Sequence, residues 1–344
     1  MELCRFVSIL LIVMLHTGFQ NFGVPTNITD TTPPLLLMQA LCNVGVDVFV
    51  LITGFYSSRL KTKSFVNLIY ICLFYAVVAI LIGCFSSQPL QLTKIFFISK
   101  SNWFIPSYIC LLAVAPFINK ACDLMSKKEL MGGVLTMGFF LTWFGWLPAL
   151  PDVSIGVHNG CSVISFSYLY IIGRYIRING LTMLNAKRSI LIYVTCAVCI
   201  AGLAYTALYL GGNYGSIMNP LIQRIYANNN PLMIISAIAF FSFFKSLRMK
   251  NSKGINFFAK STLSVLLLHG SGQFAYFMMP FFQNLYNEYN GIVCAVLWIL
   301  SVISIGLIAV VIDQVRIYTY NHVSPFLIIK AEKIVDNINK KIIQ

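Results

Sequence analysis

Two residues of one apolar segment near the start of the sequence carry side chains that are suited to chemistry. Arg5 and His16 lie near the two ends of the segment CRFVSILLIVMLHTG, with ten uncharged residues between them. An imidazole titrates near neutral pH and can therefore take a proton from a hydroxyl as a general base. Eleven helical residues turn the chain to within roughly 20° of its starting face and rise about 16 Å. The spacing predicts a guanidinium and an imidazole along one face of a helix.

Three more ionisable residues lie inside apolar segments. Asp47 lies in NVGVDVFVLITGF, His269 in STLSVLLLHGSG, and Asp313 three residues before Arg316. Ionisable groups at membrane depth are costly and usually functional, so we expect Asp47 to need a partner from another helix. We predict a local ion pair between Asp313 and Arg316. Structural interpretations also stay open, namely a topology signal for Arg5, an ion pair for Asp47, and hydrogen bonds between helices for the two histidines.

The composition indicates which elements must position these residues. The chain has 344 residues, of which 58% are hydrophobic and 10% charged, and its mean hydropathy is +0.81. A soluble domain carries about a quarter charged residues. Apolar runs of about 20 residues recur along the whole chain, which predicts several membrane-spanning helices. Lipid cannot satisfy the open edge of a sheet, so we expect an all-α bundle.

The apolar segments and the loops between them predict the topology of this bundle. We predict about ten spans, at residues 3–20, 35–57, 65–85, 102–119, 130–148, 163–178, 189–210, 230–246, 259–280 and 289–313. An even number of spans puts both termini on one side, and 21 of the 24 Lys and Arg residues fall on that side. Basic residues accumulate in cytoplasmic loops, so we expect both termini in the cytoplasm. The same bias explains the net charge of +14 without a nucleic-acid partner.

The last segment, PFLIIKAEKIVDNINKKIIQ, places apolar side chains at helical spacing among lysines. We predict an amphipathic helix that lies on the cytoplasmic face of the membrane. This divides the chain into a ten-helix transmembrane domain, residues 1–314, and a cytoplasmic tail, residues 315–344. The ten cysteines are scattered through the apolar runs and predict neither a disulfide framework nor a metal site.

Six sequence blocks resemble those of the membrane-bound acyltransferase-3 family of bacterial O-acyltransferases. They occur in the family's order within residues 1–280, and they are the Arg5–His16 pair, GVDVFVLITGF, WFIPSYICLLAVAP, YLYIIGRYIR, NNPLMIISAIAFFSFFK and FAKSTLSVLLLHGSG. The chain departs from the family where many members have Ser-Gly and this sequence has Thr53-Gly54. It also has SSRLKTK where many members carry paired arginines. We expect the stand-alone form, without the extracytoplasmic hydrolase-like domain that some members append.

The resemblance implies an O-acetyltransferase in the bacterial cytoplasmic (inner) membrane. Such enzymes take an acyl group, usually acetyl, from a cytoplasmic acyl-coenzyme A and place it on a hydroxyl, often of a surface glycan or glycolipid. The resemblance therefore implies acetyl-coenzyme A as the donor, a glycan or glycolipid as the acceptor, the lipid bilayer as the surroundings, and no metal.

The site residues are expectations of the same kind. We expect His16 to be the general base, with Asp47 or His269 to orient it. The donor's phosphates would be contacted by Arg5, Arg59, Lys61 and Lys63. Trp103 and Tyr108 would line the path of the acceptor.

A second interpretation of the buried residues is transport. A proton-coupled transporter or flippase would use His16 and Asp47 as a proton relay. The sequence also leaves open the identity of the acceptor, the length of the acyl group, and direct transfer as against an acyl-histidine intermediate.

Overall fold

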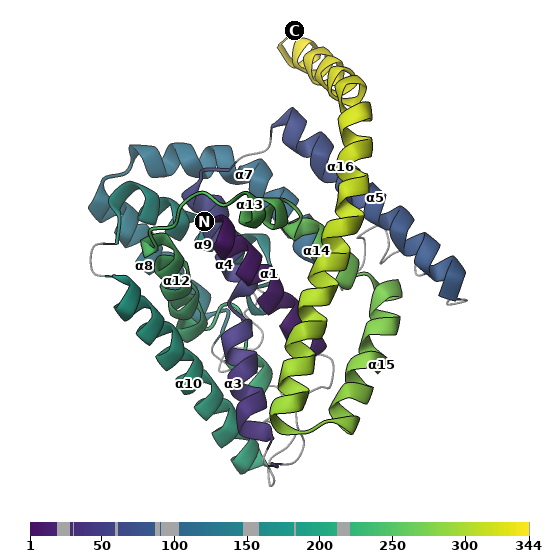
Figure 1. Ribbon diagram of the computed structural model, residues 1–344. Helices are drawn as coiled ribbons and strands as arrows, with labels where there is room; N and C mark the ends of the chain where they lie inside the picture. Colours follow the sequence, from purple (N-terminus) through teal and green to yellow (C-terminus); the bar gives the residue numbers. More distant parts are fainter. Residues whose placement is uncertain are drawn as a thin grey trace. The chain divides into compact units, whose positions relative to one another are not determined.

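The computed structural model describes residues 1–18, 28–29, 31–58, 61–86, 90, 103–146, 158–181, 184–211 and 221–343. Every regular element in these ranges is a helix, as Figure 1 shows, so the predicted all-α fold is confirmed. Five helical segments are long and apolar enough to cross a membrane: Thr32–Phe55, Thr62–Ser86, Phe104–Leu124, Ala186–Gly211 and Gly291–Val335. These helices indicate a multi-pass membrane protein. The count of ten spans and the cytoplasmic placement of the termini stay predictions.

The helices divide into two compact units. The first comprises Met1–Ser58 and Trp103–Ala259, and the second comprises Arg59–Asn102 and Lys260–Gln344. The helices of the first unit are α1 (Glu2–Thr17), α3 (Thr32–Cys42), α4 (Gly45–Phe55), α7 (Phe104–Leu124), α8 (Lys127–Trp143), α9 (Val163–Asn179), α10 (Ala186–Gly211) and α12 (Pro231–Ser246), with a 3-10 turn at His158–Gly160. The short helix α13 (Lys253–Lys260) ends where the second unit begins.

Helix α4 lies at the centre of the first unit, where it packs against α1, α9 and α12. Two glycines allow these close contacts. A Cβ on Gly45 would lie 2.6 Å from Cγ1 of Ile12 in α1, and a Cβ on Gly54 would collide with the Tyr170 backbone in α9. Small residues let membrane helices approach each other closely. The two glycines therefore hold α4 between α1 on one side and α9 on another.

Polar caps determine where several helices begin. Ser126 and Glu129 form a capping box at the start of α8. The Ser162 hydroxyl accepts from the Ser165 backbone N–H at the start of α9, and the Asn230 carbonyl oxygen accepts from the Leu232 N–H at the start of α12. Each cap satisfies a backbone donor that has no partner inside its own helix.

The second unit contains α5 (Thr62–Ser86), α14 (Thr262–His269), α15 (Gly272–Glu288) and α16 (Gly291–Ile343). Helix α5 packs against the other three. The segment predicted as one span at 259–280 contains two helices, because α14 ends at His269 and Ser271 caps α15 by accepting from the Phe274 N–H. The predicted boundary at residue 314 falls inside α16, which continues through Pro325 to Ile343. The contact of this last segment with a membrane surface stays a prediction.

Candidate active site

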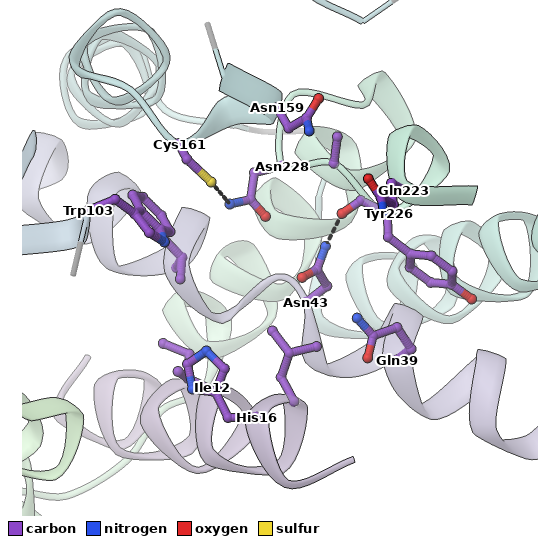
Figure 2. Close-up of a pocket in the computed structure, with 13 residues that line it drawn as sticks. Ile12, His16, Gln39, Asn43, Trp103, Asn159, Cys161, Gln223, Tyr226 and Asn228 are labelled. Carbon is purple, nitrogen blue, oxygen red and sulfur yellow. Dashed lines mark hydrogen bonds between the residues drawn. The ribbon is translucent and has the colours of Figure 1, made fainter. Parts of the chain in front are cut away.

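The first unit contains a cavity of about 570 Å³ that is open on one side, drawn in Figure 2. Cavities that bind small molecules measure about 300–1,000 Å³. His16, Trp103 and Cys161 line it, together with aliphatic side chains and the Tyr226 segment. Five carboxamide residues complete the polar part of the lining: Gln39, Asn43, Asn159, Gln223 and Asn228. Among the residues that the structure describes, no Asp, Glu, Lys or Arg lines the cavity.

Helix α1 carries both residues of the Arg-His pair. It is helical from Glu2 to Thr17, so Arg5 and His16 lie on one side of it and about 16 Å apart along its axis. His16 is in the last turn, is half-buried and faces the cavity, as Figure 2 shows. The imidazole therefore lies where a molecule in the cavity could reach it.

The two aromatic residues predicted for the acceptor path have different positions. Trp103 caps α7 and faces the cavity, and its ring centre lies 5.7 Å from that of Phe166. Tyr108 is five residues further along α7 and is not among the residues that line the cavity. Its hydroxyl lies 3.3 Å from Oγ1 of Thr53 in α4. Trp103 thus belongs to the cavity, whereas Tyr108 belongs to the contact between α7 and α4.

The carboxamides are held by contacts that join distant segments. The Asn43 amide donates to the backbone carbonyl of Tyr226, and the Asn228 backbone N–H donates to the Asn159 carbonyl at 3.0 Å. Gly160 has φ +89, and a Cβ there would lie 2.6 Å from the Asn228 Cβ. A glycine is therefore required where these two loops meet. Sequence reasoning missed these residues, although the cluster YANNNP was a visible signal.

Asp47 is fully buried in α4, but it does not line the cavity. It follows Gly45 by two residues, or about 200° of helical turn, so it points away from the α1 contact. It precedes Gly54 by seven residues and therefore shares the side of α4 that faces α9. The partner predicted from another helix is not seen, since neither carboxylate oxygen has a hydrogen-bond partner among the described residues.

Three cations gather at the end of α4, on two neighbouring aromatic rings. The Arg5 guanidinium lies 5.6 Å from the ring centre of Tyr56. Arg177 of α9 and Lys245 of α12 lie 5.2 and 5.6 Å from the ring centre of Phe55. Such distances are typical of cation–π contacts. Sequence reasoning missed Arg177 and Lys245, whose only signal was their place in the last turns of their helices.

Acidic side chains next to this cation cluster (Arg5, Arg177 and Lys245) reduce its charge only in part. Glu2 accepts from Arg5 at 2.7 Å. Arg174, one turn before Arg177, is bound instead to Asp123 and to the hydroxyl of Ser57. Arg177 and Lys245 are exposed. The cluster therefore offers positive charge to an anion at the end of α1 opposite to His16.

The other predicted site residues belong to the second unit. Arg59 lies outside the described residues. Lys61 and Lys63 are exposed at the start of α5. His269 is buried at the end of α14, where its Nδ1 faces the Val265 carbonyl. Their grouping with His16 or with Arg5 stays a prediction.

The second unit also buries a polar cluster around Asp313. Arg316 donates to both carboxylate oxygens, at 2.6 and 3.0 Å, which confirms the predicted pair. The hydroxyls of Ser261 and Ser264 also donate to Asp313. Arg316 donates in addition to the side-chain oxygen of Asn67 at 3.2 Å. Across the described ranges, no group of three or more His, Cys, Asp or Glu could hold a metal ion.

Comparison with known proteins gives one match. A family model described as an acyltransferase domain matches residues 1–312. The match covers the whole of the first unit, with every residue of the cavity, and the second unit up to residue 312. No curated protein and no solved structure matches the chain.

Proposed function

The chain belongs to the acyltransferase-3 family, and from this premise we propose that it transfers an acetyl group from cytoplasmic acetyl-coenzyme A to a hydroxyl of a surface glycan or glycolipid precursor. The observation that carries the proposal is the arrangement along α1. A cation cluster lies at one end of this helix, and His16 faces a cavity at the other. One helix thus joins a site for an anionic donor to a site for proton transfer.

The donor is an anion at one end and a thioester at the other. Its phosphates are matched by the cation cluster, where two guanidinium groups can bind phosphate oxygens in pairs. The thioester arm then runs along α1 towards His16. Glu2 competes with the phosphates for Arg5, so donor binding exchanges one ionic contact for another.

The reaction needs one proton to move twice. The His16 imidazole takes the proton of the acceptor hydroxyl while its oxygen attacks the thioester carbonyl. The tetrahedral intermediate carries a negative oxygen, which amide N–H groups of the cavity are suited to stabilise. The carbon–sulfur bond then breaks, and the imidazolium returns the proton to the leaving thiolate.

Thermal unfolding of the purified protein in detergent tests the donor. A ligand that binds the native state must raise the unfolding temperature. We expect acetyl-coenzyme A to raise it and desphospho analogues of the donor to raise it less. The variant Arg177→Gln removes one charge of the cation cluster, so acetyl-coenzyme A should raise its unfolding temperature less. If a saturating donor leaves the unfolding temperature of the folded protein unchanged, the proposal is wrong.

Transport is the competing function, and the position of Asp47 disfavours it. A relay between His16 and Asp47 needs a proton to pass between α1 and α4. The side of α4 that packs on α1 carries Gly45, whereas Asp47 faces α9. Measurement of proton uptake in vesicles without acetyl-coenzyme A separates the two functions, because only the transporter moves protons without a donor.

A further inference from the structure

The lining of the cavity indicates which acceptor it takes, provided that the proposed function holds. We propose that the cavity is the acceptor site and that it selects an uncharged sugar residue over uronic, sialic or phosphorylated ones. Five carboxamides line it together with His16, and the described part of the lining contains no carboxylate, ammonium or guanidinium group. The proposal concerns the charge class of the acceptor, which the family does not specify.

Carboxamides match hydroxyl groups in kind. Each one offers two N–H donors and a carbonyl acceptor, and each sugar hydroxyl both donates and accepts. An acidic sugar would instead need a cation, because an ionised group that leaves water without a partner is strongly disfavoured. Arg224 follows the lining residue Gln223 in the sequence, but it does not line the cavity itself. Its guanidinium donates to the Trp146 backbone carbonyl at 2.9 Å.

The contacts of the carboxamides leave hydrogen-bonding groups available. Because the partner of the Asn43 amide is a backbone carbonyl, its NH₂ group must be the donor, and its Oδ1 is left to accept. The Asn228 Nδ2 approaches Cys161 Sγ at 3.9 Å, a weak contact that leaves its carbonyl oxygen to accept as well. Both oxygens can therefore accept from sugar hydroxyls.

Trp103 supplies the apolar part of the site. Figure 2 shows its indole at one flank of the cavity, with His16 lower in the view and with Cys161, Asn228 and Asn159 above. Phe104 and Phe166 hold the ring, at 6.1 and 5.7 Å between ring centres. The C–H face of a sugar ring packs well on such a surface, while its hydroxyls reach outwards to the carboxamides.

The cavity also has a direction. Asn159 and Gln223 are exposed, whereas Gln39 and Asn43 are buried. The exposed pair lies in the loops predicted to face away from the cytoplasm, at the end of α1 opposite to the cation cluster. The acceptor therefore enters past Asn159 and Gln223, and the donor approaches from the cations.

The test compares surface glycans of cells that carry the wild-type chain, His16→Ala or no protein. Mass spectrometry with fragmentation identifies the sugar that bears each acetyl group. We expect the acetyl groups that depend on His16 to lie on neutral residues. If they lie on uronic, sialic or phosphorylated residues, the acceptor inference is overturned while the proposed function stands. If no acetyl group depends on the protein, the proposed function itself fails.

Two variants and a control sharpen the test with purified protein. Asn228→Leu should lower kcat/KM for a neutral oligosaccharide about tenfold or more, since the site then leaves a hydroxyl unpaired. Gln223→Arg changes the exposed rim of the cavity. It should raise the rate on an oligosaccharide that contains the corresponding uronic acid about tenfold relative to the rate on the neutral one. Asn256→Leu in α13 makes the same kind of change at a half-buried position outside the cavity, and it should alter neither kcat/KM for the neutral oligosaccharide nor the preference between the two sugars.

A rise in the unfolding temperature of each variant on addition of acetyl-coenzyme A shows that the variant is folded. The neutral sugar is supplied both as a soluble oligosaccharide and as a lipid-linked form in nanodiscs, and acetylation of either one supports the proposal. An equal or better rate on the uronic acid by the wild type, or an unchanged preference in Gln223→Arg, would contradict it.

Discussion

Among the described residues, each unit buries one aspartate, and the two carboxyl groups have opposite surroundings. In the second unit, Asp313 is bound by Arg316 and by two serine hydroxyls. In the first unit, the oxygens of Asp47 lack hydrogen-bond partners within the described residues. A buried charge that is fully hydrogen-bonded can be structural, whereas an unpartnered one lowers stability and is usually kept for function. From this contrast we propose a structural role for Asp313 and a functional role for Asp47.

The largest effect on stability is expected in the Asp313 cluster. Arg316→Met leaves a buried carboxylate with only serine partners, and we expect it to lower the free energy of unfolding by about 3–5 kcal/mol. The double variant Asp313→Leu with Arg316→Met should regain most of that loss, because a buried ion pair can be replaced by apolar residues. Denaturant unfolding in detergent measures both. A single variant as stable as the wild type would mean that this cluster is not structural.

The matching change in the first unit should separate stability from activity. Asp47→Asn keeps the shape and removes a buried group that can ionise, so the unfolding midpoint should stay equal or rise. We expect the transfer rate to fall about tenfold, because an amide cannot take up and release a proton as a carboxyl group does. Initial rates with saturating donor measure this effect. A full rate in Asp47→Asn would exclude Asp47 from the reaction and end the contrast with Asp313.

The cation cluster should affect the donor alone. Arg177→Gln or Lys245→Gln should raise KM for acetyl-coenzyme A about threefold to tenfold with little change in kcat, and added salt should weaken the difference. Lys61→Gln and Lys63→Gln are the matched changes in the second unit. If these two raise KM and the first two do not, the donor's phosphates bind outside the cation cluster.

The smallest effect is expected at the start of α8. Hydrogen bonds from the Ser126 side chain and backbone lower the pKa of the exposed Glu129 from its ordinary value of 4.5. Because the pKa of Glu129 is lower in the folded state than in the unfolded state, its carboxylate adds stability at pH values above the unfolded-state pKa. This stability is lost as the pH falls through the folded-state pKa. Glu129→Gln should remove this dependence, which unfolding temperatures below pH 5 would detect. If the unfolding temperature of Glu129→Gln depends on pH as that of the wild type does, the capping box adds no pH-dependent stability.

The sequence predicts features that depend on spacing within one helix. The shared face of Arg5 and His16 and the pair of Asp313 with Arg316 follow from helical geometry alone. The all-α fold follows from hydropathy, because lipid excludes open sheets.

Features that depend on contacts between distant segments could not be predicted in this way. Arg177 and Lys245 meet on Phe55 only because α9 and α12 both end beside α4. The direction of Asp47 depends on which sides of α4 carry Gly45 and Gly54, and thus on packing. The break at Gly270 has a local cap, but apolar residues on both sides hid it in the hydropathy pattern.

The most direct test of the central claim is acetyl transfer by His16→Ala, measured together with protection by acetyl-coenzyme A. The claim is that α1 separates donor binding from proton transfer. We therefore predict that transfer falls about 10²- to 10⁴-fold while acetyl-coenzyme A still raises the unfolding temperature as in the wild type. Transfer within tenfold of the wild-type rate by the folded variant would contradict the account.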